Sequence, residues 1–268
     1  MTTDKDYIFL DSPERKATIH KLHLLNLVDL YVSSDDYSKL LRYLGDNKVL
    51  KIPDIYLELL DDAFNDNQFL RVVELNKHLR KVGYRCFKDC KHLEKVEFNE
   101  NLTEIAVFAF RDTNIKEIVT NKNLKIINDY AFADCYNLSK VELNEGLEEI
   151  RNGVFISTII KELTIPETVK KIGTNLFNAV PLEDIYILSE HIDLDKAYKA
   201  VEGTLALPNK KLKMHFKKSR ERDISIAYNK LLNNVLENPL SIKTRESIER
   251  LEILFDISDK QSLLEVTE

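Results

Sequence analysis

The stretch Ile127-Asn128-Asp129-Tyr130-Ala131-Phe132-Ala133-Asp134-Cys135 decides the fold, because the chain repeats its frame along much of its length. In each copy an apolar residue stands five positions before a phenylalanine, and a small or apolar residue directly precedes that phenylalanine. The repeat phenylalanines are Phe64, Phe87, Phe110, Phe132, Phe155 and Phe177, with steps of 23, 23, 22, 23 and 22 residues. A fixed period of this length predicts an elongated array of stacked repeats.

Each repeat also contains a phrase of the form apolar-x-x-apolar-x-apolar, for example Leu70-x-x-Val73-x-Leu75. The alternation at its end predicts a strand with one face turned inward and one outward. The residue that follows is a turn former, and in successive copies it is Asn76, Asn99, Asn121, Asn144 or Pro166. We therefore expect one strand per repeat, followed by a corner. The chain then returns across the core through phrases such as Leu79-x-x-Val82, and the phenylalanine anchors a short helical or irregular segment.

These repeats resemble the BspA-like class of leucine-rich repeats, in which the repeat runs approximately L-x-x-I-x-I-P-x-x-V-x-x-I-G-x-x-A-F-x-x-C-x-x-L. The sequence of residues 160–173, IKELTIPETVKKIG, matches that pattern almost completely, and the resemblance extends over about residues 47–188. It implies an α/β repeat solenoid, right-handed, of the leucine-rich-repeat type, with a stacked strand face and helical caps. Many members of this class use the strand-lined face for adhesion or other protein contacts.

The period divides the chain into four expected regions. Residues 1–46 form an amino-terminal cap, 47–192 hold about six repeats of 22–23 residues, 193–218 form a degenerate last repeat with a terminal strand, and 219–268 form a carboxy-terminal helical cap. The first cap is expected to contain a helix over 13–26, a degenerate strand phrase over 27–32, and a second helix that begins at Ser33 and ends at Gly45.

Beyond the repeats, residues 193–201 carry a helical apolar stripe that ends near Gly203. Leu212, Met214 and Phe216 then alternate with polar residues, which predicts a last strand. Two amphipathic helices, over 220–236 and 244–255, would cover the end of the array, because an open solenoid end exposes its core.

The three cysteines, Cys86, Cys90 and Cys135, are predicted to be packing residues. Cys86 stands in a column of small or apolar residues directly before the repeat phenylalanines, so burial is expected. Cys90 and Cys135 share another column but lie two repeats apart, which at ~4.8 Å per layer separates them by roughly 10 Å, beyond the ~7 Å limit for a disulfide. We therefore expect free thiols.

Composition and motifs disfavour several classes of function. With 39 basic and 45 acidic residues the net charge is −6, which disfavours a general nucleic-acid binder. The chain has no glycine-rich phosphate loop, H-E-x-x-H, C-x-x-C or G-x-S-x-G motif. His20 and His23 could share a helical face, but no third ligand has suitable spacing. We expect no catalytic residue, no metal site, no cofactor and no enzymatic activity.

The amino terminus has no basic run followed by an apolar core, and no stretch approaches the ~18 apolar residues of a membrane span. Many members of the BspA-like class are surface or secreted proteins, but these features predict a cytoplasmic protein without a membrane partner. The oligomeric state is left open by the sequence.

The leading functional hypothesis is a non-enzymatic protein-interaction module that binds a protein partner through the strand face. About nine strands at ~4.8 Å spacing would give a face roughly 40 Å long. Two outward columns of strand positions supply the candidate partner-binding residues Glu74, Lys95, Glu97, Lys140, Glu142 and Tyr186.

Two alternatives concern other partners. Residues 209–222 hold seven Lys or Arg against one acid, and Lys211, Lys213 and Lys217 could bind phosphates of nucleic acid. We favour a structural interpretation, in which lysines on a terminal strand prevent edge-to-edge pairing. Low glycine with many Lys, Asn and Ile suits an AT-rich bacterial or viral genome, so an inhibitor of a host protein complex, encoded by a phage or mobile element, is the other alternative.

Overall fold

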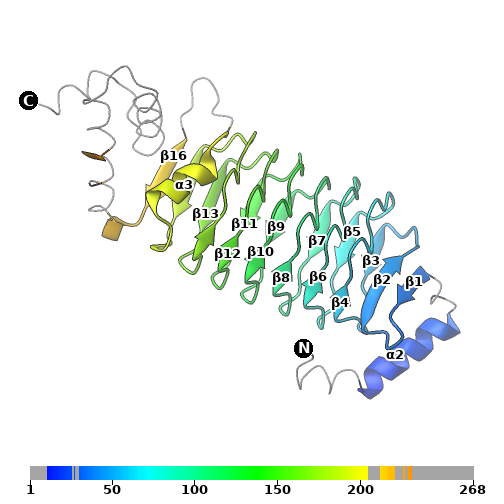
Figure 1. The fold of residues 1–268 in the computed structure, drawn as a ribbon. Helices are drawn as coiled ribbons and strands as arrows, with labels where there is room; N and C mark the ends of the chain where they lie inside the picture. Colours follow the sequence, from blue (N-terminus) through cyan, green and yellow to red (C-terminus); the bar gives the residue numbers. More distant parts are fainter. Residues whose placement is uncertain are drawn as a thin grey trace, which may run out of the picture.

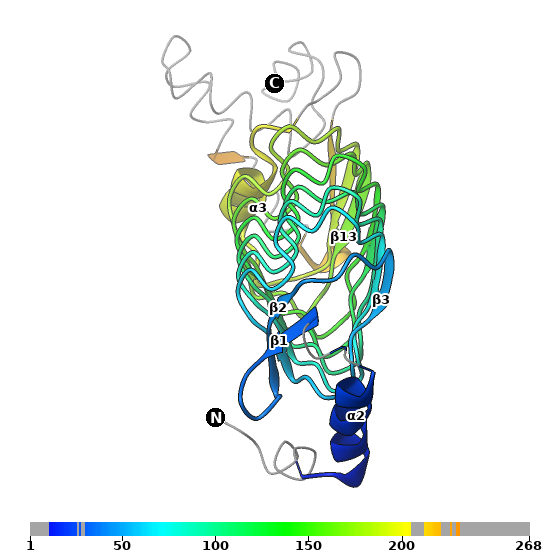
Figure 2. The same ribbon diagram turned by 90° about the vertical axis from the view of Figure 1, so that its right-hand side faces the viewer.

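The computed structural model describes residues 11–25, 27, 30–204, 212–220, 226 and 229–230. The chain coils into a β-solenoid whose layers follow one another in sequence order along one axis (Figure 1). Each repeat forms one coil and contributes a strand to each of two sides of the solenoid. Figure 2 shows the coils one behind another, with helix α2 at one end of the stack. The predicted solenoid with a stacked strand face is confirmed.

The first apolar phrase of each repeat forms a strand on one side of the solenoid, here called the strand face. Its strands are β3 (Val49–Lys51), β5 (Val72–Glu74), β7 (Lys95–Glu97), β9 (Glu117–Val119), β11 (Lys140–Glu142), β13 (Glu162–Ile165), β15 (Asp184–Ile187) and β16 (Lys213–Phe216). All pairs on this face are parallel, and they form the groups β3-β5-β7, β9-β11 and β13-β15-β16. The expected continuous face is thus interrupted between β7 and β9 and between β11 and β13.

The second apolar phrase forms strands of its own, which the sequence analysis missed. They build a sheet in the order β1-β2-β4-β6-β8-β10-β12-β14, parallel throughout except for β1 with β2. Six of these strands have two residues, too few for a period of two to be read from sequence. Their bounds are β1 (Tyr31–Ser33), β2 (Lys39–Tyr43), β4 (Glu58–Leu59), β6 (Lys81–Val82), β8 (Glu104–Ile105), β10 (Ile126–Ile127), β12 (Glu149–Ile150) and β14 (Lys171–Ile172).

The corner that carries each repeat phenylalanine is built from turns. Two residues per corner adopt the left-handed conformation, for example Tyr130 at φ 56° and Asp134 at φ 60°. Aspartate tolerates this conformation because its short side chain bonds to the local backbone, and it recurs at the second position as Asp66, Asp89, Asp112 and Asp134. The expected short helical or irregular segment is therefore irregular.

The core is a continuous column of phenylalanine rings along the solenoid axis. Adjacent rings stack with centroids between 4.7 Å, for Phe64 and Phe87, and 6.2 Å, for Phe132 and Phe155. Cys86 and its column are completely buried beside these rings, as predicted. Each layer therefore buries its apolar surface against its two neighbours, which is how a solenoid gains stability.

Asparagine side chains bind successive coils together at the corner after each strand of the strand face. Asn121 Nδ2 donates to Asn99 O at 2.7 Å and to Leu102 O at 3.0 Å in the preceding coil. Its Oδ1 accepts from the backbone N–H groups of Asn123 and Leu124. The same pattern recurs at Asn76 and Asn99, so this column satisfies backbone groups that a sharp corner would leave unpaired.

The helix predicted at the amino-terminal end is confirmed as α2 (Pro13–Leu24), with Ser12 as its N-cap. The second helix predicted there, from Ser33 to Gly45, is wrong. This segment forms the antiparallel hairpin β1–β2. Its apolar residues fit a helical stripe, but Leu40 pairs with Leu59 of β4 and is fully buried, so pairing with the neighbouring coil decides the structure.

The carboxy-terminal elements that the structure describes agree with the sequence. Helix α3 (Leu194–Val201) is N-capped by Asp193, and β16 pairs in parallel with β15. A short 3-10 helix, η2 (Lys218–Arg220), follows. The predicted helices over 220–236 and 244–255 lie outside the described residues, apart from 220, 226 and 229–230. Within the described ranges, no helix is long and apolar enough to cross a membrane.

Candidate functional site

The strand face opens between β7 and β9. In the preceding pair of coils the Leu75 N–H donates to Glu97 O at 3.1 Å. The equivalent groups one coil later are the Phe98 N–H and the Val119 carbonyl, and no hydrogen bond joins them. By the register of the array, these two groups are directed toward each other across the opening. Equivalent bonds are present from Ile52 to Glu74 and from Thr120 to Glu142.

Both ends of the opening are held closed. At one end the Lys116 N–H donates to Glu94 O at 3.3 Å. At the other end the Asn121 side chain donates to Asn99 O at 2.7 Å. Only the middle of the two strands is therefore apart, and the opening is a closed-ended slot.

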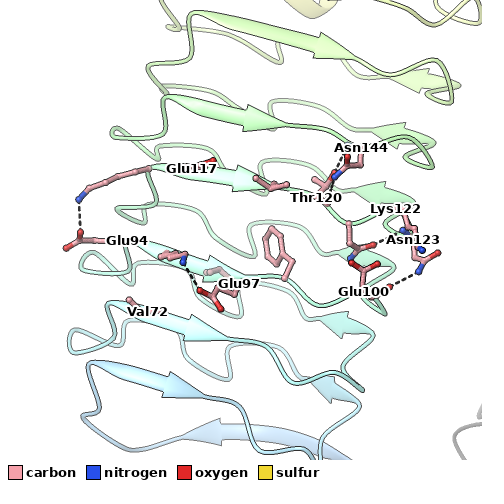
Figure 3. Close-up of a pocket in the computed structure, with 15 residues that line it drawn as sticks. Val72, Glu94, Glu97, Glu100, Glu117, Thr120, Lys122, Asn123 and Asn144 are labelled. Carbon is pink, nitrogen blue, oxygen red and sulfur yellow. Dashed lines mark hydrogen bonds and ion pairs between the residues drawn. The ribbon is translucent and has the colours of Figure 1, made fainter.

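The slot widens into a hollow of about 1220 Å³ on the strand face, here called the β7–β9 hollow (Figure 3). Its apolar part consists of Val72, Val96, Phe98 and Val119. Val96 and Phe98 are half-buried, and Val119 is 45% exposed. In Figure 3, Val72 and Glu97 lie on one side of the hollow, with Glu117 and Thr120 on the other. The hollow thus has a small apolar centre within a mostly polar lining.

The interruption coincides with a change in coil length. Leu93 stands six residues after Phe87, whereas Ile115 stands five residues after Phe110. The same change from six to five accompanies the second interruption, between β11 and β13. The opposite change, between β9 and β11, leaves the ladder intact. The shortening of this segment from six to five residues is thus the sequence feature that accompanies the hollow.

Most charged side chains that line the hollow are paired, but Glu100 and Lys122 form no ion pair with the described residues. Lys95 Nζ lies 2.6 Å from Glu97 Oε1, and Lys116 Nζ lies 2.6 Å from Glu94 Oε2. The hydrogen bond from Lys116 lowers the pKa of Glu94, and the bond to Glu97 raises the pKa of Lys95. Both pairs are exposed, and exposed ion pairs contribute little to stability. The rim therefore presents mostly paired charges around an apolar centre.

Of the predicted partner-binding residues, Lys95 and Glu97 line the hollow. Lys140 lies one strand beyond it on β11 and pairs with Glu117, which also lines the hollow. Glu142 stands beside Val119 in the strand register. It forms no ion pair with the described part of the chain.

The other two predicted residues lie away from the hollow. Glu74 precedes Glu97 in the same column and pairs with Lys51 at 2.8 Å. Tyr186 is on β15, where its ring stacks on His215 with centroids 4.4 Å apart. His215 Nε2 is in turn 2.7 Å from Asp184 Oδ1. The structure thus brings together only part of the predicted set.

The alternative basic edge is only partly described. Lys213 is exposed on β16. Lys217 forms an ion pair with Glu167, so part of its charge is compensated. Lys211 lies outside the described residues.

Val72, Val96, Phe98 and Val119 were not predicted from the sequence as candidate binding residues. Val96 and Phe98 were expected to point inward and be covered, as their equivalents Val73 and Leu75 are. The missing pairing between β7 and β9 leaves them half-exposed. Only the shortening from six residues between Phe87 and Leu93 to five between Phe110 and Ile115 could have signalled this.

The described residues hold no assembled reactive group of a metal or thiol site. They contain no cluster of three or more His, Cys, Asp or Glu side chains suited to a metal ion. Cys86, Cys90 and Cys135 are free thiols and buried. Burial raises the pKa of Cys90 to about 12 and that of Cys135 to about 11, so both thiols are held in the unreactive protonated form.

Residues 58–183 match the family described as BspA type leucine rich repeat region, in six copies. This part of the chain is a BspA-type leucine-rich repeat region. The family match agrees with the resemblance inferred from the repeat sequence pattern. It also agrees with the structure, in which each repeat forms one coil. No curated protein matches the sequence.

Several solved bacterial structures are similar to this repeat region in fold. A leucine rich cell surface protein from Faecalibacterium prausnitzii has 20% identity and a TM-score of 0.46, over 60% of this chain and 53% of that one. The leucine rich repeat protein of T. pallidum has 18% identity and a TM-score of 0.46, over 73% and 91%. A leucine-rich repeat protein from Bacteroides ovatus has 19% identity and a TM-score of 0.41, over 70% and 62%. The chain thus spans about half the length of the Faecalibacterium protein.

Proposed function

We propose that the BspA-type repeat region is a non-enzymatic protein-interaction module, and that the β7–β9 hollow is the energetic centre of its binding surface. The observation that carries the proposal is a hollow on the strand face that has an apolar centre and is bordered by ion pairs. Binding energy at protein interfaces concentrates where a few apolar or aromatic groups are desolvated inside a polar rim. The hollow has this arrangement before any partner is present.

Rigidity supports the same function. The stacked phenylalanine column and the asparagine bonds between coils fix the strands in place. A surface that is already ordered loses little conformational entropy on binding. A stable folded partner buries about 800 Å² on each side of the interface, more than one hollow offers. The partner would therefore cover neighbouring coils as well, including Glu74 and Glu142.

In this proposal the charged columns act as the rim. Lys95 and Glu97 border the hollow. Lys140 forms an ion pair with Glu117, which lines the hollow. Their contribution would lie in selecting a partner and its orientation, because compensated rim charges add little affinity. Tyr186, three strands along the face from β9, would contact only a larger partner.

The test is affinity capture from an extract of the source cells with Val119→Glu beside the unaltered protein. Val119 is 45% exposed, so a charge there enters the hollow without entering the core. Ile159→Glu is the matched control, because Ile159 is 44% exposed and does not line the hollow. We expect Val119→Glu to lose the captured protein and Ile159→Glu to retain it.

Two further variants locate the surface if that expectation fails. Reversal of Glu74, Glu97 and Glu142 to Lys tests the predicted acidic column. Reversal of Lys213 and Lys217 to Glu tests the basic edge, for which a steep salt dependence would indicate nucleic acid. Capture that survives Val119→Glu but is lost in the basic-edge variant would show that the strand face is not the binding surface.

A further inference from the structure

The β7–β9 hollow also holds a backbone donor and a backbone acceptor with no protein partner in the described structure. Where neighbouring coils pair, the backbone N–H at the position of Phe98 donates to the next strand, and the carbonyl at the position of Val119 accepts from the preceding strand. Leu75 and Glu97 occupy these positions in the coils before, and they form this bond. Across the hollow, neither group makes this bond. Backbone groups of folded proteins are almost always paired with protein, water or ligand. The hollow therefore offers at least this N–H and this C=O to whatever enters it, and the Glu117 N–H likewise lacks the bond that its equivalent Lys95 makes to Arg71 O.

We propose that the β7–β9 hollow receives one residue of an extended segment of the partner protein, with a large neutral apolar side chain. That side chain would pack on Val72, Val96 and Val119. The backbone amide next to it would accept from the Phe98 N–H and donate to the Val119 carbonyl. This inference rests on the proposed function and specifies the chemistry of the partner.

The closed ends of the slot limit the occupant to a side chain and its own amide. Adding a whole strand between β7 and β9 would require roughly twice the ~4.8 Å strand spacing along their full length. The bond from Lys116 to Glu94 and that from Asn121 to Asn99 prevent this separation at the two ends. The segment must therefore cross over the hollow and insert one residue.

The walls favour a large apolar group. Phe98 is held in place by an edge-to-face contact with Phe110, at 5.8 Å between centroids, so the inner wall is rigid. Aromatic rings gain from such contacts in addition to the surface they bury. A hollow of about 1220 Å³ is larger than one aromatic side chain, which leaves room for the adjoining amide groups.

The rim disfavours a charged occupant. Glu100 and Lys122, which form no ion pair with the described residues, lie with Asn123 at one end of the hollow (Figure 3), whereas Lys95 and Lys116 are each bonded to a glutamate. A charged side chain entering the hollow would lose water without gaining a free counter-charge from these pairs. A neutral aromatic residue is therefore the best match.

Chemical-shift mapping on the ¹⁵N-labelled full chain tests this with three probes. N-acetyl-L-phenylalanine methylamide carries both the ring and the amide. N-acetylglycine methylamide carries only the amide, and toluene carries only the ring. We expect saturable shifts of the Phe98 and Val119 amides with the first probe, with a Kd on the order of 1 mM for so small a ligand. The other two probes should bind at least about ten-fold more weakly, because each lacks half of the contacts.

Val119→Glu should raise the Kd of N-acetyl-L-phenylalanine methylamide at least about ten-fold, whereas Ile159→Glu should leave that Kd unchanged. Equal binding of toluene would overturn the amide contact, and equal binding of the glycine analogue would overturn the apolar one. No shift at Phe98 and Val119 would overturn the peptide assignment altogether. If Val119→Glu nevertheless abolishes capture of the partner, the interaction module stands and only this description of its ligand fails. If capture is unaffected by Val119→Glu, the proposed function fails, whatever the probes do.

Discussion

The rings of Phe110 and Phe132 lie parallel, with an interplanar angle of 3° and centroids 5.3 Å apart. They occupy the same position in successive repeats, so a 22-residue step in sequence becomes one layer in space. The contact recurs along the column, from Phe64 to Phe177. The contacts that stabilise this protein therefore run along one axis, between each layer and the next.

Phe132→Ala should lower the free energy of unfolding by about 3–5 kcal/mol, because it removes a fully buried ring and leaves a cavity between two layers. Chemical denaturation followed by circular dichroism measures this. Tyr136→Ala is the control, since Tyr136 is 60% exposed, and it should change stability by less than about 0.5 kcal/mol. Equal stability of the two variants would contradict the layer assignment.

Asn121→Ala should cost at least about 2 kcal/mol, because it removes two donated bonds and leaves backbone groups of Asn99, Asn123 and Leu124 without their partner. Asn137→Ala provides the comparison, since the exposed Asn137 side chain bonds, within the described part of the chain, only to the side chain of Asn114. The same denaturation experiment separates the two. Similar losses would show that the corner column does not hold the coils together.

The Phe98 amide should exchange its hydrogen at least about ten-fold faster than the amides of Leu75 and Thr120. The latter two donate to the next coil, at 3.1 Å and 2.9 Å, and the Phe98 amide does not. Hydrogen exchange followed by NMR gives the three rates in one sample. Comparable protection at all three positions would mean that β7 and β9 pair in solution and that the hollow is closed.

Stability should fall at alkaline pH because of the buried thiols. An unfolded cysteine has a pKa of about 8.5. Burial raises the pKa of Cys90 to about 12 and that of Cys135 to about 11. The folded state therefore keeps protons that the unfolded state releases, so stability is fully present below about pH 8.5 and declines above it. By pH 10 the loss should be about 2 kcal/mol for each of these thiols.

The repeat columns themselves supply a control for the alkaline effect. Alanine occupies the Cys86 column at Ala109, and threonine occupies the Cys90 and Cys135 column at Thr113 and Thr158. The variant Cys86→Ala, Cys90→Thr, Cys135→Thr should therefore fold and lose much of its pH dependence between 8.5 and 10. An unchanged slope would assign the effect to other groups, such as Tyr56, where burial raises the pKa to about 12.

Several elements of the fold follow from residues that are close in sequence. The helix α2 is set by Ser12 and Pro13 at its start, and α3 by Asp193. The strand β16 follows from the alternation of Leu212, Met214 and Phe216. These features depend on local bonds or on side-chain direction, which sequence spacing reports directly.

The candidate site was predicted less completely. The sequence placed Lys95 and Glu97 on the correct face, because alternation along a strand separates inward from outward side chains. It did not reveal that Val96 and Phe98 are half-exposed, because alternation gives the direction of a side chain but not what covers it. Coverage depends on the neighbouring coil, which is separated by more than twenty residues in the chain.

The sequence by itself determined the coil, its period and the identity of the core column, since the same residue types return every 22 or 23 positions and must stack. Tertiary structure alone decided whether adjacent coils close on each other. Pairing with β4 turned the expected helix after Ser33 into a hairpin, and loss of pairing between β7 and β9 opened the hollow. The reason is that hydrogen bonds between coils join residues far apart in sequence, and their presence or absence at one layer depends on small differences in coil length and packing.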